Sequence, residues 1–236
     1  ISLLNPSEGR QVAEYNDRSK HLYKAVLCLR LFDQLYLDEM ISDAYILECL
    51  AAVPPSQYQD FINETSPEYQ LFTEQVKVPL IMVAVLQDIG NHHPDAKRIL
   101  YGETSTANPY RVLEPVIRKQ LLQINYAETM KYLSLGIGAG KYIGNFERDA
   151  FDESEKAKVA FMQSILKRWA NSKDIIGNLL KVPQIYTSII LSTKANYDYR
   201  MLPKVYQVLK LNVDRGHCLI KVVDCLYKIT GMFPIG

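Results

Sequence analysis

The sequence VPLIMVAVLQDIG, at residues 78–90, decides the fold class of this chain. Residues 78–86 form its longest apolar run. The run is about half as long as a helix that crosses a bilayer, so it predicts a buried helix and not a membrane span. We therefore expect an all-α fold with this segment at its centre and no membrane insertion.

Helical periodicity extends to both sides of this run. Between Asp152 and Ala170, apolar residues fall on one stripe of a helix while basic residues face away from it. Asp152 and Glu155 have the spacing of a capping box, which predicts the start of that helix. Ser66 followed by Pro67 predicts another start. Further helices are predicted at residues 22–36, 43–52, 69–86, 110–135, 205–211 and 219–229, whereas residues 186–191 give only a weak strand signal.

The composition is that of a globular protein, with 48% apolar and 22% charged residues among 236. We expect one multi-helix domain over residues 1–236, with residues 1–77 as its N-terminal helical part. A net charge of +1 provides no global field that would recruit nucleic acid.

The four cysteines lie singly within apolar helical patterns, which is typical of reduced, buried thiols in a cytoplasmic protein: Cys28, Cys49, Cys218 and Cys225.

A glycine-rich segment, GIGAGK at residues 136–141, has the residue types of a phosphate-binding loop. Its spacing does not fit, because a phosphate loop has four residues between the first glycine and Gly-Lys and is followed by Ser or Thr. Here three residues intervene and Tyr142 follows. A connection between two helices is therefore the favoured interpretation of this segment.

Two further segments contain residues that bind ligands in other proteins. Asp88, His92 and His93 combine carboxylate and imidazole groups, as metal sites do. Adjacent histidines point in different directions on most backbones, so a helix-terminal aspartate with exposed histidines is the competing interpretation. The second segment has aromatic and basic side chains that could stack on bases and contact phosphates, with structural packing as the alternative: Lys194, Tyr197, Tyr199 and Arg200.

The order of several motifs resembles that of HD-GYP domains in the HD superfamily. VAVLQDIG, at residues 83–90, is similar to the apolar helix and His-Asp-Ile-Gly of that family. Similar elements follow in the expected order over residues 78–236: His93-Pro94 with Ile99-Leu100, LKVPQIYTS at 180–188, YDYRMLP at 197–203 and GMFP at 231–234. The resemblance implies an all-helical core that holds two or three iron or manganese ions and hydrolyses cyclic di-GMP.

The chain departs from this family at the metal ligands. Gln87 stands where the family has histidine, Gln184 stands where it has aspartate, and residues 126–173 contain no histidine. Glutamine offers a neutral amide oxygen, which cannot hold a hydrolytic di-metal centre or drive a bound water towards hydroxide. We therefore expect no catalytic residues, no metal and no cofactor. The resemblance leaves a vestigial site at Gln87, Asp88, His93 and Gln184, and we expect the two glutamines and Asp88 to join in a neutral hydrogen-bond network.

The sequence thus predicts a non-catalytic regulatory or protein-interaction module of a bacterial signalling protein. Its partner would be another protein or a second copy of the chain. Two alternatives stay open. One is a metal-dependent cyclic di-GMP phosphodiesterase with an atypical set of iron or manganese ligands. The other is a sensor that binds a cyclic dinucleotide without cleaving it.

Overall fold

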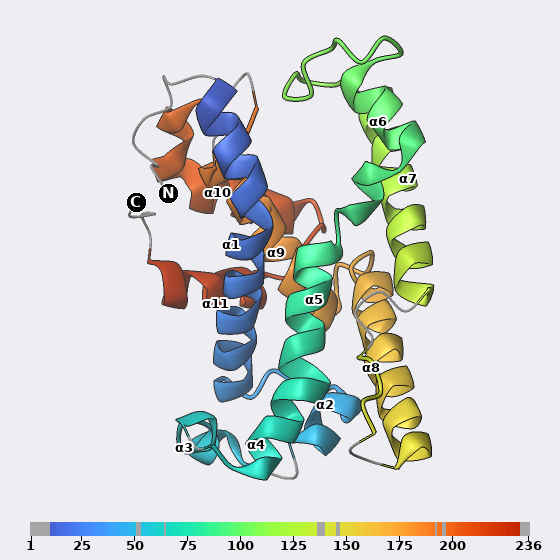
Figure 1. Ribbon diagram of the computed structural model, residues 1–236. Helices are drawn as coiled ribbons and strands as arrows, with labels where there is room; N and C mark the ends of the chain where they lie inside the picture. Colours follow the sequence, from blue (N-terminus) through green and yellow to red (C-terminus); the bar gives the residue numbers. More distant parts are fainter. Residues whose placement is uncertain are drawn as a thin grey trace.

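The computed structural model describes residues 10–50, 53–63, 65–135, 140–144, 147–191, 193–194 and 197–231. Within these ranges every regular element is helical, which confirms the all-α prediction (Figure 1). The α-helices are α1 (Arg10–Leu37), α2 (Ala44–Cys49), α3 (Tyr58–Asn63), α4 (Pro67–Phe72), α5 (Val78–Leu86), α6 (Pro94–Tyr101), α7 (Pro115–Ser134), α8 (Arg148–Arg168), α9 (Ile175–Ile190), α10 (Val205–Asp214) and α11 (Ile220–Thr230). Short helical segments lie between them: η2 (Pro55–Gln57), η3 (Thr73–Lys77), η4 (Ile89–His92) and η5 (Tyr199–Lys204).

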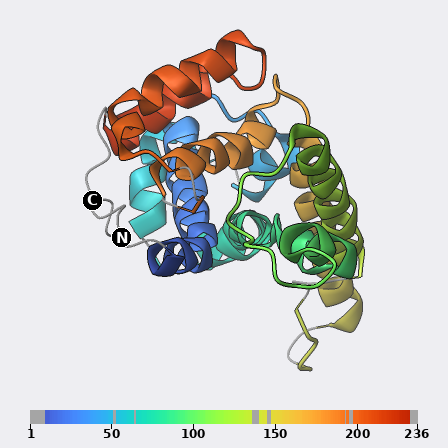
Figure 2. The ribbon, with the colours of Figure 1, turned by 90° about the horizontal axis from the view of Figure 1, so that it is seen from above.

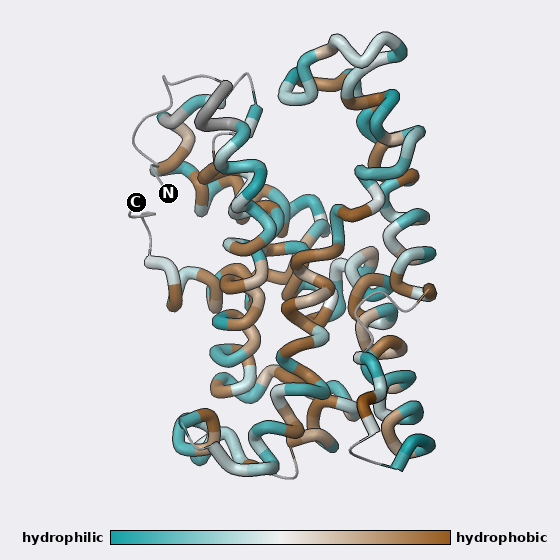
Figure 3. The backbone as a smooth tube through the Cα atoms, in the orientation of Figure 1, coloured by the Kyte–Doolittle hydropathy of each residue, from teal (hydrophilic) through white to brown (hydrophobic). Residues whose placement is uncertain are grey.

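Helix α5 lies at the centre of the molecule, as its apolar sequence predicts. It packs against α1 on one side and α8 on the other. Leu80, Val83 and Ala84 are fully buried in this contact. Figure 3 shows the apolar stretch along α5 and the neighbouring inner faces. None of the described helices is long and apolar enough to span a membrane.

Helix α1 belongs to the same core as the rest of the chain. It contacts α5, α9 and α11, and it buries Leu31, Phe32 and Leu35 completely. Figures 1 and 2 show α6 and α7 on one side of α5, with α10 and α11 beyond α1 and α9 on the other. The junction of α1, α5 and α7 therefore brings together segments that are far apart in the sequence.

The capping residue predicted from the sequence is confirmed at the start of α4, and the one predicted for α8 is wrong. The side chain of Ser66 accepts a hydrogen bond from the Tyr69 amide at 3.1 Å and caps α4. Helix α8, in contrast, begins at Arg148, so Asp152 lies inside the helix and does not cap it. The Glu155 carboxylate instead accepts a hydrogen bond from the Gly140 amide at 2.6 Å, and the predicted capping box does not form. Residues 136–139 of the glycine-rich segment lie outside the described residues.

The segment with a weak strand signal, residues 186–191, belongs to α9 up to Ile190. Helix α9 begins at the N-cap Asp174, whose side chain accepts a hydrogen bond from the Gly177 amide at 2.8 Å. Arg168 donates a hydrogen bond to the same carboxylate at 2.8 Å and also pairs with Asp43, the N-cap of α2. One guanidinium group therefore joins the ends of three helices. The four cysteines are free thiols; Cys28, Cys218 and Cys225 are buried as predicted, whereas Cys49 is only partly buried.

Candidate functional site

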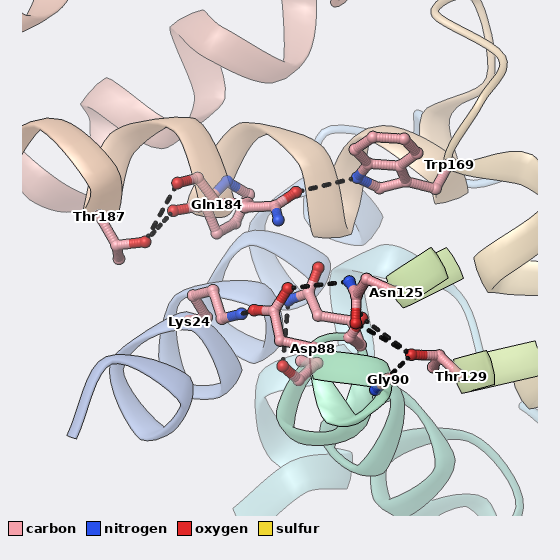
Figure 4. Close-up of polar contacts among 11 residues, drawn as sticks. Lys24, Asp88, Gly90, Asn125, Thr129, Trp169, Gln184 and Thr187 are labelled. Carbon is pink, nitrogen blue, oxygen red and sulfur yellow. Dashed lines mark hydrogen bonds and ion pairs between the residues drawn. The ribbon is translucent and has the colours of Figure 1, made fainter. Parts of the chain in front are cut away.

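The candidate site lies where the C-terminus of α5, η4 and the middle of α7 meet (Figure 4). The amide of Gly90 donates a hydrogen bond to the Thr129 hydroxyl at 3.1 Å. The side-chain amide of Asn125 donates to the backbone carbonyl of Gln87 at 3.1 Å and to Asp88 at 3.4 Å. Asn125 and Thr129 are both buried. Polar contacts thus attach α7 to η4 and to the end of α5.

Asp88 is paired with an ammonium group from another part of the chain. The Nζ atom of Lys24, on α1, binds the Oδ2 atom of Asp88. The Lys24 side chain is 1% exposed, whereas that of Asp88 is 38% exposed. The predicted neutral network is therefore wrong in its central feature, because a buried ammonium compensates the carboxylate. A lysine within the apolar stretch YKAVLCL, at residues 23–29, is the sequence signal that could have indicated this pair.

The side chains of the two glutamines in the predicted vestigial site form hydrogen bonds with partners other than Asp88. The Gln87 amide is buried and donates a hydrogen bond to the Ala84 carbonyl, within its own helix, at 3.0 Å. The amide oxygen of Gln184 accepts a hydrogen bond from the Trp169 indole at 3.2 Å (Figure 4). Within the described residues, no hydrogen bond connects Gln184 with Gln87 or Asp88. Each glutamine satisfies a local partner, so the network inferred from the resemblance does not form.

His93 also has a structural role. It is the N-cap of α6, where its Nδ1 atom accepts a hydrogen bond from the Asp95 amide at 3.3 Å. Its Nε2 atom lies 3.9 Å from the Glu128 carboxylate. Across the part of the chain that the structure describes, no three His, Cys, Asp or Glu side chains gather closely enough to hold a metal ion. The donors at this junction are therefore a poor fit for a di-metal centre, because lysine and local hydrogen bonds already use them.

The residues proposed for base stacking make contacts with neighbouring parts of the chain, among them a hydrogen bond from the Tyr197 amide to the Lys194 carbonyl at 3.1 Å. The Tyr197 hydroxyl donates a hydrogen bond to the Ile190 carbonyl at 3.1 Å, which ties this segment to the end of α9. Arg200 donates to Asp198 at 2.9 Å. Tyr199 begins η5, and its side chain lies outside the described part of the structure. Lys194 follows α9 and is exposed.

No family model matches this sequence, and no curated protein or solved structure matches it either. The resemblance to HD-GYP domains therefore stays a prediction that rests on the order of short motifs. The contacts around Asp88 are observed in the structure and do not depend on this resemblance.

A substitution at Gln184 tests its local role. Replacing Gln184 by leucine is expected to leave the Trp169 indole N–H without its partner and to lower the free energy of unfolding by about 1 kcal/mol. Trp169 is the one tryptophan in the sequence, so its fluorescence reports on this contact directly. The Gln184→Glu variant, which keeps an acceptor, serves as the control. An unchanged emission spectrum and unchanged stability in Gln184→Leu would contradict the assignment.

Proposed function

We propose that the chain is a non-catalytic regulatory or protein-interaction module of a bacterial signalling protein, derived from an HD-GYP phosphodiesterase fold. The observation that supports this most directly is the ion pair between Lys24 and Asp88. Asp88 is the residue that the resemblance places at the metal-binding aspartate of the family. Here a lysine ammonium supplies the positive charge that the carboxylate requires.

An ammonium group compensates charge without providing metal chemistry. It has no coordination position for a water molecule and cannot lower the pKa of a bound water as a divalent ion does. A metal ion at Asp88 would have to displace Lys24, whose ammonium is buried and would then lose its charge partner. The pair therefore opposes metal binding at the position where the resemblance would place a metal.

The surface of α7 supports an interaction role. Its residues 115–126 include Val116, Ile117, Leu122 and Tyr126, with exposed fractions between 39% and 77%. The residues that α7 buries include Asn125 and Thr129, which are polar. Apolar side chains that gather on an exposed helix are typical of surfaces that contact other proteins.

Metal content and hydrolysis test the proposal. After purification in the presence of iron and manganese, elemental analysis should find far less than one ion per chain, and cyclic di-GMP should remain intact. A His93→Ala variant provides the control, because metal that binds loosely through that histidine would be lost in it. About two ions per chain in the wild-type protein, or turnover of cyclic di-GMP, would contradict the proposal.

A further inference from the structure

Exposed apolar side chains are concentrated on α7 and on the connection from α7 to α8. Among the described residues, eighteen large apolar side chains are exposed, and eight of them lie between residues 112 and 143. The most exposed of these are Ile143, at 80%, and Val116, at 77%. Such a concentration is typical of a surface that contacts another protein.

The start of α7 carries a groove with positive charge, which we call the basic end. The groove has a volume of about 430 Å³, and Arg118 and Lys119 line it together with one carboxylate, Glu114. Neither cation has a carboxylate partner within the part of the chain that the structure describes. The guanidinium of Arg111 donates a hydrogen bond to the Ile99 carbonyl at 2.7 Å and holds the preceding loop in place. The remaining lining of the groove is apolar: Val112, Leu113, Pro115 and Leu122.

The start of α8 carries a second groove with negative charge, which we call the acidic end. This groove has a volume of about 480 Å³, and its lining includes Phe151, Val159 and Asp152, with Glu155 and Lys156 as a balanced pair of charges. The adjoining residues 147–153 carry one cation, Arg148, and four carboxylates: Glu147, Asp149, Asp152 and Glu153. Arg148 lies 3.9 Å from Asp152. Asp149 and Glu153 are exposed, and no cation among the described residues pairs with either of them.

Contacts with α8 hold an apolar side chain in a projecting position beside the acidic end. The amide of Gly140 donates a hydrogen bond to the Glu155 carboxylate at 2.6 Å. The rings of Tyr142 and Phe151 lie with their centroids 5.5 Å apart. Ile143 therefore belongs to a segment that is attached to α8, although its own side chain is exposed. Each end thus combines a groove with an exposed apolar side chain, which is Val116 at the basic end.

The basic and acidic ends lie at opposite extremes of one edge of the molecule. Figure 1 shows α7 and α8 along this edge, with α7 beginning beside α6 and α8 beginning at the far extreme. The two helices also contact each other directly. A two-fold rotation that brings two such edges together therefore places each basic end against the acidic end of the other copy.

We propose that the edge formed by α7 and α8 binds a second copy of the chain in a two-fold dimer, in which each basic end covers the partner's acidic end. Two-fold symmetry repeats the favourable contact, so opposite charges meet twice and both grooves are covered. A separate acidic protein would cover the basic end alone and leave the second groove exposed. This inference rests on the proposed interaction function and names its partner.

Reversal of charge at each end, measured by sedimentation equilibrium on the full chain, tests the arrangement. The wild-type chain should form dimers and no larger species. Arg118→Glu/Lys119→Glu and Asp149→Lys/Glu153→Lys should each weaken the dimer about tenfold or more, because like charges then face each other in both contacts. All four substitutions in one chain should restore the dimer. An equimolar mixture of the two double variants should form a heterodimer, because opposite charges again meet at both contacts.

Two further variants separate this surface from general effects of charge. Arg215→Glu/Lys221→Glu reverses two exposed cations near α10 and α11, on the opposite side of the molecule, and should leave the dimer unchanged. Ile143→Ser removes a projecting side chain and should weaken the dimer about tenfold, the effect of losing one buried apolar side chain. The Tm of every variant, measured in parallel, identifies any that fails to fold.

Four results would overturn the inference. One is a wild-type chain that stays monomeric, and another is growth into larger species, which would contradict the two-fold arrangement. A third is a fourfold-substituted chain that folds but dimerises as weakly as the double variants, since the charges would then not face each other. The last is equal weakening by the control variant. Metal-dependent hydrolysis of cyclic di-GMP would instead contradict the proposed non-catalytic function and leave the dimer standing.

Discussion

Replacing Gly90 by alanine is expected to lower the free energy of unfolding by about 3 kcal/mol, at the upper end of the range for overpacked sites. A Cβ atom at Gly90 would lie 2.2 Å from the carbonyl oxygen of Asn125 and 2.8 Å from its Cα atom. These are backbone atoms of α7, which cannot rotate away as a side chain can. Either η4 or α7 has to move, and the hydrogen bond from Gly90 to Thr129 would be lost with that movement.

Urea denaturation of Gly90→Ala measures this cost, with Gly140→Ala as the matched control. At Gly140 a Cβ atom would meet only side-chain atoms of Glu155, at 3.3 Å, and that flexible side chain can shift. The control should therefore lose much less stability than Gly90→Ala. Equal losses in the two variants would show that the close approach of η4 and α7 does not limit stability.

The second large effect is an asymmetry between the two members of the buried ion pair. Asp88→Asn removes the charge that compensates the buried Lys24 ammonium, and we expect it to cost about 3 kcal/mol. Lys24→Met replaces the lysine stem by an apolar chain of similar length. It leaves Asp88, which is 38% exposed and can be hydrated, so the expected cost is smaller, about 1 kcal/mol.

A double-mutant cycle measured by urea denaturation separates the pair from its surroundings. In Lys24→Met/Asp88→Asn no charge is left uncompensated, so the double variant should be more stable than Asp88→Asn alone. If Lys24→Met proved as costly as Asp88→Asn, the difference in exposure would not govern this pair. If the double variant lost the sum of both single effects, the two residues would not interact.

The features predicted correctly from the sequence are those that depend on neighbouring residues. The apolar run at 78–86 gives the buried α5, and Ser66 before Pro67 gives the start of α4, because both signals lie within a few residues. The predicted start of α8 is wrong. Glu155, the expected capping partner of Asp152, instead binds the amide of Gly140 in the loop that precedes the helix.

The candidate site was predictable only in part. The sequence motif singles out Asp88. It does not indicate Lys24, the ion-pair partner of Asp88, which lies 64 positions away in the sequence. Local spacing carries no information about a contact at that separation. Gln184 was expected near Asp88 on the strength of the resemblance, and the nearby Trp169 is its partner instead.

The contacts of Arg168 have a consequence for the order of events in folding. Arg168 binds Asp174 six positions away, but it also binds Asp43, which lies 125 positions earlier in the chain. The first contact forms with little loss of chain entropy, whereas the second requires the intervening helices to be near their final positions. We therefore expect the start of α9 to form locally and early, and the start of α2 to be completed only when most of the chain has assembled.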